Sequence, residues 1–402
     1  MMPGNALEKE PCMDISQDNQ RINDKKLFLL VWIGLMVVWL LTVMNPLFGD
    51  TGRLISDYED MSAYYIHAEW VTTHDVPVSE YPQIPTYLLG LNRFITGIFN
   101  TSIQFAVFYA ITVLEMITAL FVTVKLLYEK FPSERKYRGL LMLTPPILYF
   151  IVNRFDILPA LLCILALNMA QEKKWVPASI LLAAATFTKW YPILILPGFF
   201  IYACLQERKF QWKMIVSFTL TSLVILLPTY MMGGMEAVLF PYQFHAGRGL
   251  EFVSLPVIIN NLLAALFTTS LSQQVFILVF LALQISSPVF LLFHRPDTIE
   301  KLTHYCILSI AIFIIFARVN SPQWIIWLMP FLIISIKNKV DIWVIIVYSI
   351  VTYLFFPLCF DACGFTSVQL KILGIATYLI LAIIIIRSIK GMGIQIKKGM
   401  AE

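Results

Sequence analysis

Charged side chains are scarce in this chain. Asp, Glu, Lys and Arg make up 13% of its 402 residues, against roughly 25% in a soluble globular domain. Apolar residues make up 59% and gather in runs of about 15 to 26 residues, the length scale of membrane-spanning helices. Because backbone polar groups in lipid must bond within their own segment, these runs are expected to be helical. The composition excludes an ordinary soluble domain and predicts an all-α membrane protein.

Long hydrophilic segments and common cofactor motifs are missing as well. The longest hydrophilic stretch is the tail before residue 27, which is too short for a nucleotide-binding domain. No P-loop, dinucleotide fingerprint, HExxH or GxSxG motif occurs. The pattern of a cleavable signal peptide is not visible, so residues 28–47 are expected to be a retained first span. The basic tails flank apolar runs, and no nucleic-acid partner is expected.

Cysteine is sparse too, with six residues scattered along the chain. Cys163, Cys204 and Cys306 lie in apolar runs, where they are expected to be packing residues. Cys359 and Cys363 are four positions apart near a predicted outer loop. For this pair we favour packing or free thiols over a disulfide or part of a metal site.

The apolar runs predict one polytopic transmembrane helical bundle. Residues 1–27 are expected to be a cytoplasmic tail, residues 28–387 the transmembrane domain, and residues 388–402 a second cytoplasmic tail. The twelve predicted spans are 28–47, 102–127, 139–152, 157–171, 175–189, 191–205, 213–231, 273–292, 303–317, 323–337, 341–357 and 368–387.

The distribution of basic residues supports this topology. Four of them lie in the N-terminal tail, which should therefore be cytoplasmic under the positive-inside rule. Alternation then places 22 of the 29 basic residues, and the C-terminus, on the cytoplasmic side. The count requires 82–99 and 254–268 to be helices that lie in or dip into the outer interface; both are short and contain proline and asparagine.

Several predicted spans are short and are joined by only a few residues on the outer side. Short helices place these connections below the membrane surface. Polar backbone at that depth is tolerated only where it lines a cavity. The pattern therefore predicts a cavity that opens to the outside.

Polar and aromatic residues gather in five clusters on the predicted outer side. An ionisable group at the end of an apolar helix is costly and often functional, although snorkelling to headgroups is the plain alternative. The first cluster is DYEDMSAYYIHAEW (57–70), followed by SEYPQIP (79–85). Asp57 and Asp60 would share one face of a helix, where a raised pKa would let one of them act as a base. A solvated acidic loop is the alternative.

Two further clusters lie at short turns. NRFDILPA (153–160) contains Arg154 and Asp156, which could simply neutralise each other. In TKWYP (188–192), Lys189 precedes two aromatic residues. It is either a snorkelling lysine in an aromatic belt or a lysine that meets an anion at the mouth of the cavity.

The last two clusters add arginines. FHAGRGLEFVS (244–254) has Arg248 between Gly247 and Gly249, where backbone can approach a ligand closely, and arginine suits phosphate oxygens. FARVNSPQWIIWLMP (316–330) is a polar turn whose glutamine and tryptophans could bind a sugar ring; an interfacial turn is the alternative. Glu115 stands alone within a span, and we favour a hydrogen bond to a neighbouring helix for it.

Taken in order, these motifs resemble a known family. DMSAYYIHA with EYP downstream, NRFDILPALL, ATFTKWYPILILP, RGLEFVS and RVNSPQWIIWLMP are similar to motifs of the polyprenyl-phosphate-sugar-dependent glycosyltransferases of the C-type fold. The resemblance covers roughly residues 45–330 and is closest to the bacterial integral-membrane alpha-mannosyltransferases of the phosphatidylinositol-mannoside type. The mannosyltransferase of eukaryotic GPI-anchor synthesis has related motifs.

The resemblance implies roles for individual residues. Asp60 is the expected catalytic base, with Asp57 as runner-up, and Lys189 and Arg248 are the candidates for the donor phosphate. Arg154 and Arg318 are second choices for the phosphate. The further expected substrate-binding residues are Tyr64, Tyr81, Asp156, Tyr191, His245, Glu251, Gln323 and Trp324.

The chain departs from the family pattern in places. Val253 replaces part of a second polar element, and YPP is YPQ at residues 81–83. The Asp-x-Asp motif of the eukaryotic relatives becomes Asp57-x-x-Asp60, so metal dependence is not implied and no cofactor is expected.

The expected function follows from the resemblance. It is transfer of a hexose, with mannose favoured, from a polyprenyl-phosphate donor to a lipid or glycan acceptor on the outer face of the cell membrane. A lipid or glycolipid transporter or flippase is the alternative, and it would show inverted repeats and polar sites at the bilayer midplane. A structural or assembly membrane protein is the third option.

Overall fold

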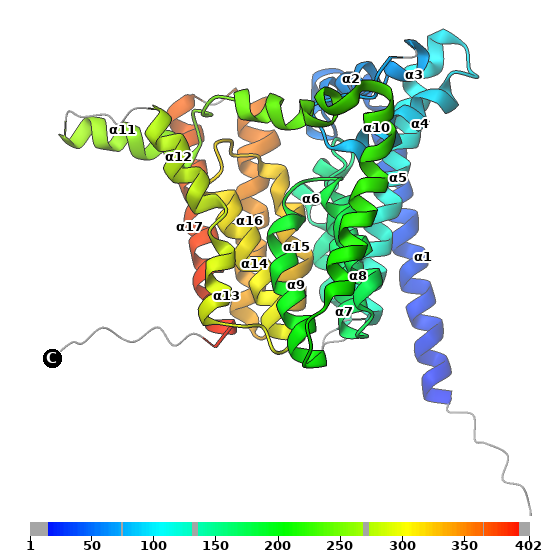
Figure 1. Ribbon diagram of the computed structural model, residues 1–402. Coiled ribbons are helices and arrows are strands. Elements are labelled where there is room, and N and C mark those ends of the chain that lie inside the picture. Colours follow the sequence, from blue (N-terminus) through cyan, green and yellow to red (C-terminus); the bar gives the residue numbers. More distant parts are fainter. Residues whose placement is uncertain (1–14, 74, 131–135, 268–272, 365, 394–402) are drawn as a thin grey trace, which may run out of the picture.

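The computed structural model describes residues 15–73, 75–130, 136–267, 273–364 and 366–393. Every regular element in these ranges is a helix, and the long helices stand side by side as a bundle (Figure 1). This confirms the all-α prediction. We call the end of the bundle that carries α2 (Tyr58–His67) and α11 (Leu255–Phe267) the upper end, as it is drawn in Figure 1.

Five helices are long and apolar enough to cross a membrane. They are α1 (Ile15–Val43), α5 (Thr101–Lys130), α10 (Trp212–Gly247), α16 (Lys339–Tyr353, apolar to Phe360) and α17 (Ser367–Gly391). Only 17% of the apolar window of α1 and 11% of that of α10 are buried inside the protein. Apolar surface exposed on this scale marks contact with a membrane, so the chain has the helices of a membrane protein.

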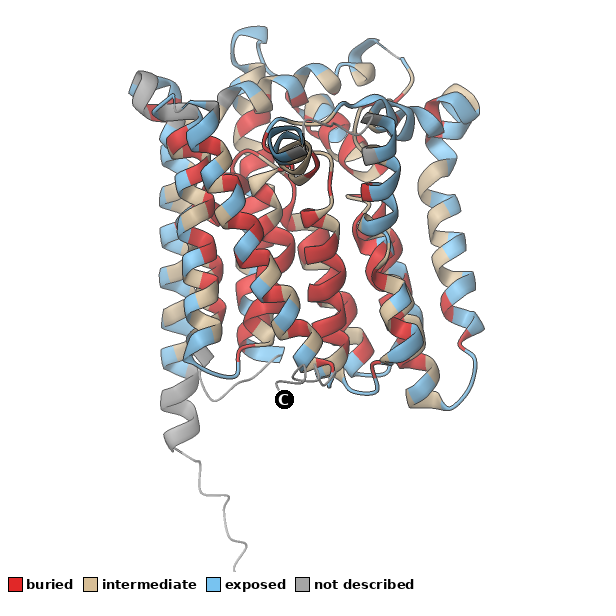
Figure 2. Ribbon diagram, turned by 90° about the vertical axis from the view of Figure 1, so that its left-hand side faces the viewer, coloured by how far each residue is buried: buried red, intermediate tan, exposed pale blue. Residues whose placement is uncertain are grey.

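Shorter helices form the centre of the bundle. They are α7 (Ile157–Gln171), α8 (Trp175–Thr186), α9 (Pro192–Glu207), α14 (Ile299–Ile315) and α15 (Ile325–Ile334). Their side chains make up most of the buried core, which is red in Figure 2. At 1.5 Å per residue, α15 is about 15 Å long and α5 about 45 Å. The turns at the upper ends of the central helices therefore lie between longer neighbours, as the sequence predicts for a cavity.

The remaining elements are short. The α-helices are α3 (Trp70–Thr73), α4 (Gln83–Thr96), α6 (Pro145–Ile151), α12 (Gln273–Gln284) and α13 (Phe290–Phe293). The 3-10 helices are η1 (Asn45–Leu54), η2 (Lys136–Leu143), η3 (Ser287–Val289) and η4 (Pro322–Trp324), and η5 (Leu354–Ala362) is a π-helix.

Several predicted spans are not single helices, among them 139–152 and 273–292. The segment 139–152 is divided between η2 and α6, because Pro145 and Pro146 lack the backbone N–H that a continuing helix needs. The segment 273–292 is divided after Gln284, two residues before a serine–proline turn that starts η3.

Several predicted helix ends are also displaced, most of all those of α10 and α1. α10 continues from the predicted end at 231 to Gly247, turning at Gly234, whose φ of 65° is readily adopted only by glycine. α1 begins at Ile15, so half of the predicted N-terminal tail is helical, and α17 continues to Gly391.

The two predicted interfacial segments correspond to α4 and α11. α11 lies at the upper end of the bundle and projects sideways from it, at a steep angle to the long helices (Figure 1). α4 packs against α5, where Nδ2 of Asn92 donates to Oε2 of Glu115 at 2.8 Å. This bond confirms the favoured interpretation of Glu115. The number of membrane crossings and their direction stay predictions.

The thiols also agree with the favoured interpretation. Cys163, Cys204, Cys306, Cys359 and Cys363 are free, and three of them are buried.

Candidate functional site

A cavity of about 490 Å³ lies at the upper end of the bundle. It forms where the turns at 152–156, 187–191 and 316–321 meet α2 and the end of α10. Ten of the residues singled out from the sequence line it: Asp60, Tyr81, Arg154, Lys189, Tyr191, His245, Arg248, Arg318, Gln323 and Trp324. The chain therefore brings together residues from five separate sequence clusters.

Asp60 reaches the cavity from the first turn of α2. Its carboxylate forms an ion pair with the guanidinium of Arg154, and both side chains are largely buried. Nε of Arg154 also donates to Oε1 of Gln323 at 2.7 Å. Burial lowers the pKa of Arg154, yet a guanidinium stays protonated in proteins. The cavity thus holds a carboxylate and a cation in direct contact.

Asp57 does not share this surface. α2 begins at Tyr58, so Asp57 is its N-cap residue, and its carboxylate accepts the N–H of Glu59 at 3.0 Å. Asp57 therefore lies just before the helix rather than within it, although its carboxylate is close enough to Arg154 to raise the pKa of that guanidinium. The spacing assumed that both residues lie inside the helix, whereas an N-cap residue has extended backbone.

Asp156 is fully buried and is held from two sides. Nε1 of Trp327 donates to its Oδ1 at 2.6 Å, and Nζ of Lys189 lies 3.6 Å from its Oδ2. Asp156 and Arg154 form their direct ion pairs with Lys189 and Asp60, although the carboxylate of Asp156 also raises the pKa of Arg154. Asp156 lies beneath the cavity and orients groups that line it.

Lys189 is a buried cation rather than a snorkelling one. Its Nζ lies 4.7 Å from the ring centroid of Phe155 and 5.3 Å from that of Tyr81. The carboxylate of Asp156 lies close enough to attract this ammonium group. The ring faces and the carboxylate together fix the ammonium group at the cavity wall.

Arg318 holds the end of α10 in place. Its guanidinium donates to the carbonyl oxygens of His245 at 3.0 Å, Ala246 at 3.3 Å and Arg248 at 3.2 Å. A cation at a helix C-terminus is favourable because the last carbonyls have no partner in the helix. Arg318 therefore positions the segment that carries Arg248. The side chain of Arg248 is exposed and makes no ion pair or hydrogen bond within the described ranges.

Glu251 and Tyr64 lie behind the cavity instead of lining it. Oε2 of Glu251 accepts the N–H of Asn320 at 2.7 Å, which ties the segment after α10 to the turn before α15. Burial raises the pKa of Glu251. The buried ring of Tyr64 packs edge-on against Tyr81, with ring centroids 5.5 Å apart. Both residues support neighbours that do reach the cavity.

Stacked rings form one wall. Trp324 and Trp327 are stacked with centroids 5.0 Å apart, and Tyr191 stacks on Trp327 at 4.4 Å. On another side, His245 packs edge-on against Trp190 at 4.7 Å, and its Nε2 lies 3.0 Å from the carbonyl oxygen of Glu80. Tyr191 and Trp327 are buried, so Trp324, Trp190 and His245 are the rings with surface left for a sugar.

Several lining residues were not among the predicted site residues. They include Glu80, Trp190 and Gln284, together with the apolar Leu281, Ile285 and Phe313. Glu80 and Trp190 are next to predicted site residues in the sequence. Gln284 is a polar residue within an apolar run, a pattern from which it could have been predicted as a site residue. Nothing in the local sequence of Trp327 indicates its bond to Asp156.

The structure also bears on two further features that the sequence raised, the glycines beside Arg248 and a metal site. A Cβ on Gly247 or Gly249 would meet no atom within 4 Å, so no packing within the protein requires glycine there. Among the described residues, no group of three His, Cys, Asp or Glu side chains could hold a metal ion.

The cavity combines three chemical capacities. It has a carboxylate that can take a proton, several cations that can hold an anion, and ring faces that can hold a sugar. Comparisons with models of protein families and with curated proteins found no match. The chemistry of the cavity is therefore argued from the residues that line it.

Proposed function

We propose that the protein is a membrane glycosyltransferase that moves a hexose from a polyprenyl-phosphate donor to a hydroxyl of a lipid or glycan acceptor. One observation carries the proposal: Asp60, Lys189 and Arg248 line the same cavity, although they come from three distant segments. Mannose is the first sugar to test, because the motifs resemble those of mannosyltransferases.

The cations fit a phosphate leaving group. Cleavage of the bond between sugar and phosphate leaves negative charge on the phosphate, and fixed cations stabilise that charge as it develops. Arg248 is free to bind phosphate oxygens in a bidentate manner, and Lys189 is held rigidly by Asp156. Rigid placement avoids reorganisation during the reaction.

The proposed reaction is a single displacement. The acceptor oxygen forms a bond to the anomeric carbon while the bond from that carbon to the phosphate oxygen breaks. The electron pair leaves with the lipid phosphate, and the hydroxyl proton passes to the carboxylate of Asp60. No other reactant is needed.

The ion pair between Asp60 and Arg154 bears on this step. A carboxylate that is paired with a cation is a weaker base than a free one. A donor phosphate in the cavity would compete for the guanidinium of Arg154. Donor binding would thereby free Asp60 to accept a proton.

The lining also offers a route for the isoprenoid. Leu281 and Ile285 of the α12 region line the cavity and are 45% and 55% exposed. Phe313 of α14 lines it beside them. An apolar wall that continues to the outside of the bundle suits a phosphate attached to a lipid chain rather than a soluble nucleotide.

The proposal is tested with purified protein in liposomes. Polyprenyl-phosphate mannose and a nucleotide-linked mannose are supplied in turn with extracted membrane lipids as acceptors, and products are identified by mass spectrometry. We expect transfer only from the lipid-linked donor, and none by Asp60→Asn. Transfer only from the nucleotide-linked donor would overturn the proposal. Movement of intact donor across the bilayer without sugar transfer would favour the transporter alternative.

A further inference from the structure

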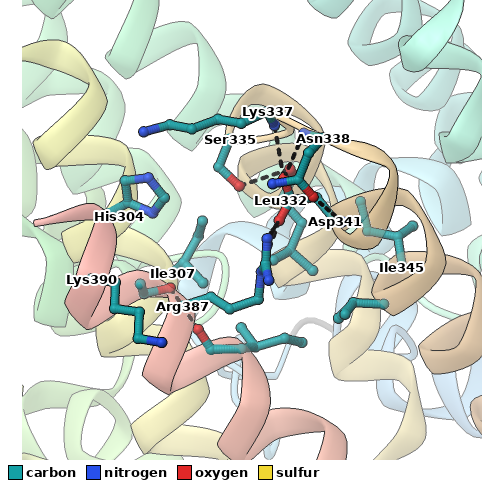
Figure 3. A pocket seen from close by; sticks show the side chains of 14 residues that line it. His304, Ile307, Leu332, Ser335, Lys337, Asn338, Asp341, Ile345, Arg387 and Lys390 are labelled. Atoms are coloured by element: carbon teal, nitrogen blue, oxygen red, sulfur yellow. Dashed lines mark hydrogen bonds and ion pairs between the residues drawn. The ribbon is translucent and has the colours of Figure 1, made fainter. Parts of the chain in front are cut away.

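A second cavity, of about 260 Å³, lies at the lower end of the bundle. It is enclosed by the beginnings of α14 and α16 and the ends of α15 and α17. Because α14 and α15 also reach the upper cavity with their other ends, the two cavities are at opposite ends of the same helices. The proposed transfer reaction uses none of the residues around this second cavity (Figure 3).

His304 of α14 is the unusual residue here. Its side chain is only 6% exposed, and both ring nitrogens are buried without a hydrogen-bond partner among the described residues. The ring lies against Gly391, where a Cβ would come within 2.3 Å of ring atoms. Buried polar groups almost always have a partner. A buried imidazole without one needs a partner from outside the described chain, either a ligand or an ordered water.

The acid beside the cavity is already satisfied. Oδ1 of Asp341 accepts from Nε of Arg387 at 2.8 Å, and its Oδ2 accepts the N–H groups of Lys337 and Asn338 at 2.8 and 3.0 Å. This arrangement holds the guanidinium of Arg387 at the cavity, where Figure 3 shows it between His304 and Asp341. Asp341 thus holds the guanidinium of Arg387 in place, and its carboxylate has little remaining capacity to accept a hydrogen bond from a ligand.

The side chains around the cavity that remain available to a ligand are hydrogen-bond donors. Lys390 of α17 lines the cavity, is exposed, and has no ion-pair partner in the described parts of the chain. Lys337 also lines it, although its ammonium is paired with Glu300. Lys390, the outer N–H groups of Arg387 and the imidazole of His304 suit the oxygens of a phosphate.

The inner wall of the cavity is apolar. Ile307, Ile345 and Ile384 line it and are buried. A water molecule has a share of about 30 Å³ in the liquid, so the space suits a headgroup and not a whole lipid. A charged rim above apolar residues fits the junction between a lipid headgroup and its chains.

We propose that this lower cavity binds a phosphate group, as carried by the headgroup of an anionic membrane lipid. Basic pockets between transmembrane helices are known settings for anionic headgroups. The inference is independent of the proposed transferase activity, since no residue is shared between the two cavities.

The test measures ligand binding to the full chain in detergent by native mass spectrometry and by the shift in unfolding temperature. The probes are phosphatidylglycerol, phosphatidylcholine, glycerol phosphate and inorganic phosphate. The variants are Lys390→Ala and His304→Leu. Lys339→Ala is the matched control, because Lys339 is an exposed lysine at the same end that does not line the cavity.

We expect phosphatidylglycerol to bind more tightly than phosphatidylcholine, and Lys390→Ala to weaken its binding about fivefold, with Lys339→Ala unchanged. His304→Leu should lose binding yet unfold no earlier than the wild type without lipid, because it removes buried nitrogens that have no partner. If His304→Leu does not fold, Lys390→Ala against Lys339→Ala still decides the question.

Binding of inorganic phosphate or glycerol phosphate with the same variant pattern would support the phosphate site and identify a soluble ligand as its source. Equal weakening by Lys390→Ala and Lys339→Ala would reduce the effect to general surface charge and overturn the proposal. Absence of binding by all four probes would overturn it as well.

Discussion

The guanidinium of Arg154 forms an ion pair with the carboxylate of Asp60 and at the same time donates to Oε1 of Gln323 at 2.7 Å. One cation from the turn before α7 therefore links α2 to the turn before α15. This link places Asp60, the proposed base, and the stacked indole rings of Trp324 and Trp327 on the same side of the cavity. It also gives Asp60 a fixed orientation, which a base on a surface helix would otherwise lack.

The first prediction separates the two aspartates. Asp60→Asn keeps the shape of the side chain and removes its basicity, so turnover should fall by about 100-fold or more. Asp57→Asn should retain most activity and stability, because asparagine is as good an N-cap residue as aspartate. Both are measured by sugar transfer in liposomes, with donor binding as the control for folding. Near-normal turnover by Asp60→Asn with loss in Asp57→Asn would transfer the role to Asp57.

The second prediction concerns the donor phosphate. Arg248→Glu should raise the apparent KM for the donor or suppress turnover by about tenfold or more, since hydrogen bonds to charged groups are worth roughly 1.5–3 kcal/mol. The unfolding temperature should change little, because the side chain is exposed. Lys371→Glu is the control for added negative charge at the same end. An equal effect of both variants would count against a phosphate contact.

Lys189 cannot serve as an equally clean probe. Nζ of Lys189 lies 3.6 Å from the carboxylate of Asp156, which is fully buried. Removing one partner of a buried pair costs about 3–5 kcal/mol. Lys189→Glu should therefore unfold at a markedly lower temperature, whatever its effect on transfer.

These contrasts indicate what the sequence alone can predict. Helices, short central spans and a cavity at their ends follow from the spacing of apolar runs, because helix length is set by residue count. The turns that carry Arg154, Lys189 and Arg318 are readable for the same reason. The partners of these residues cannot be predicted in the same way. Arg318 donates to carbonyls at the end of α10, and Trp327 donates to Asp156. In both cases the partners are far apart in the sequence, and no local pattern connects them.

Helix boundaries account for the other differences. Asp57 lies one residue before α2, where its carboxylate caps the helix by accepting the N–H of Glu59. The break at Pro145 was readable from the proline pair. The continuation of α10 beyond Gly234 was not, because two glycines and the proline at 241 would ordinarily end a helix.

The third prediction compares two stacked tryptophans. Trp327→Phe keeps an aromatic ring but removes the N–H bonded to Asp156 at 2.6 Å, so it should destabilise the protein by about 1–3 kcal/mol. Trp324→Phe removes an N–H for which the structure gives no hydrogen bond, and it should change stability by less than about 0.5 kcal/mol. Unfolding in detergent measures both. Equal losses would show that the Asp156 bond is not the cause.

The fourth prediction is a pH dependence of stability. Burial raises the pKa of Glu251 above 4.5 in the folded protein. The folded state therefore binds more protons than the unfolded state between the two pKa values, and this residue's contribution to stability falls as pH rises through that window. Glu251→Gln should match the wild type below the unfolded pKa and be relatively more stable at neutral pH, while still accepting the Asn320 N–H. A constant difference at every pH would contradict this.

The fifth prediction distinguishes two roles for Arg154. As the positioning partner of Asp60, it needs the arginine fork, and Arg154→Lys should lower kcat while preserving the charge. As an independent phosphate ligand, it would mainly affect the KM of the donor. A cycle that combines Arg154→Lys with Asp60→Asn separates the roles, because residues that act as a unit are not additive. If Arg154 acts through Asp60, Arg154→Lys should have little further effect on the residual turnover of Asp60→Asn. Multiplied effects would instead place Arg154 on the donor phosphate, and the ion pair would then serve only to hold the empty cavity in shape.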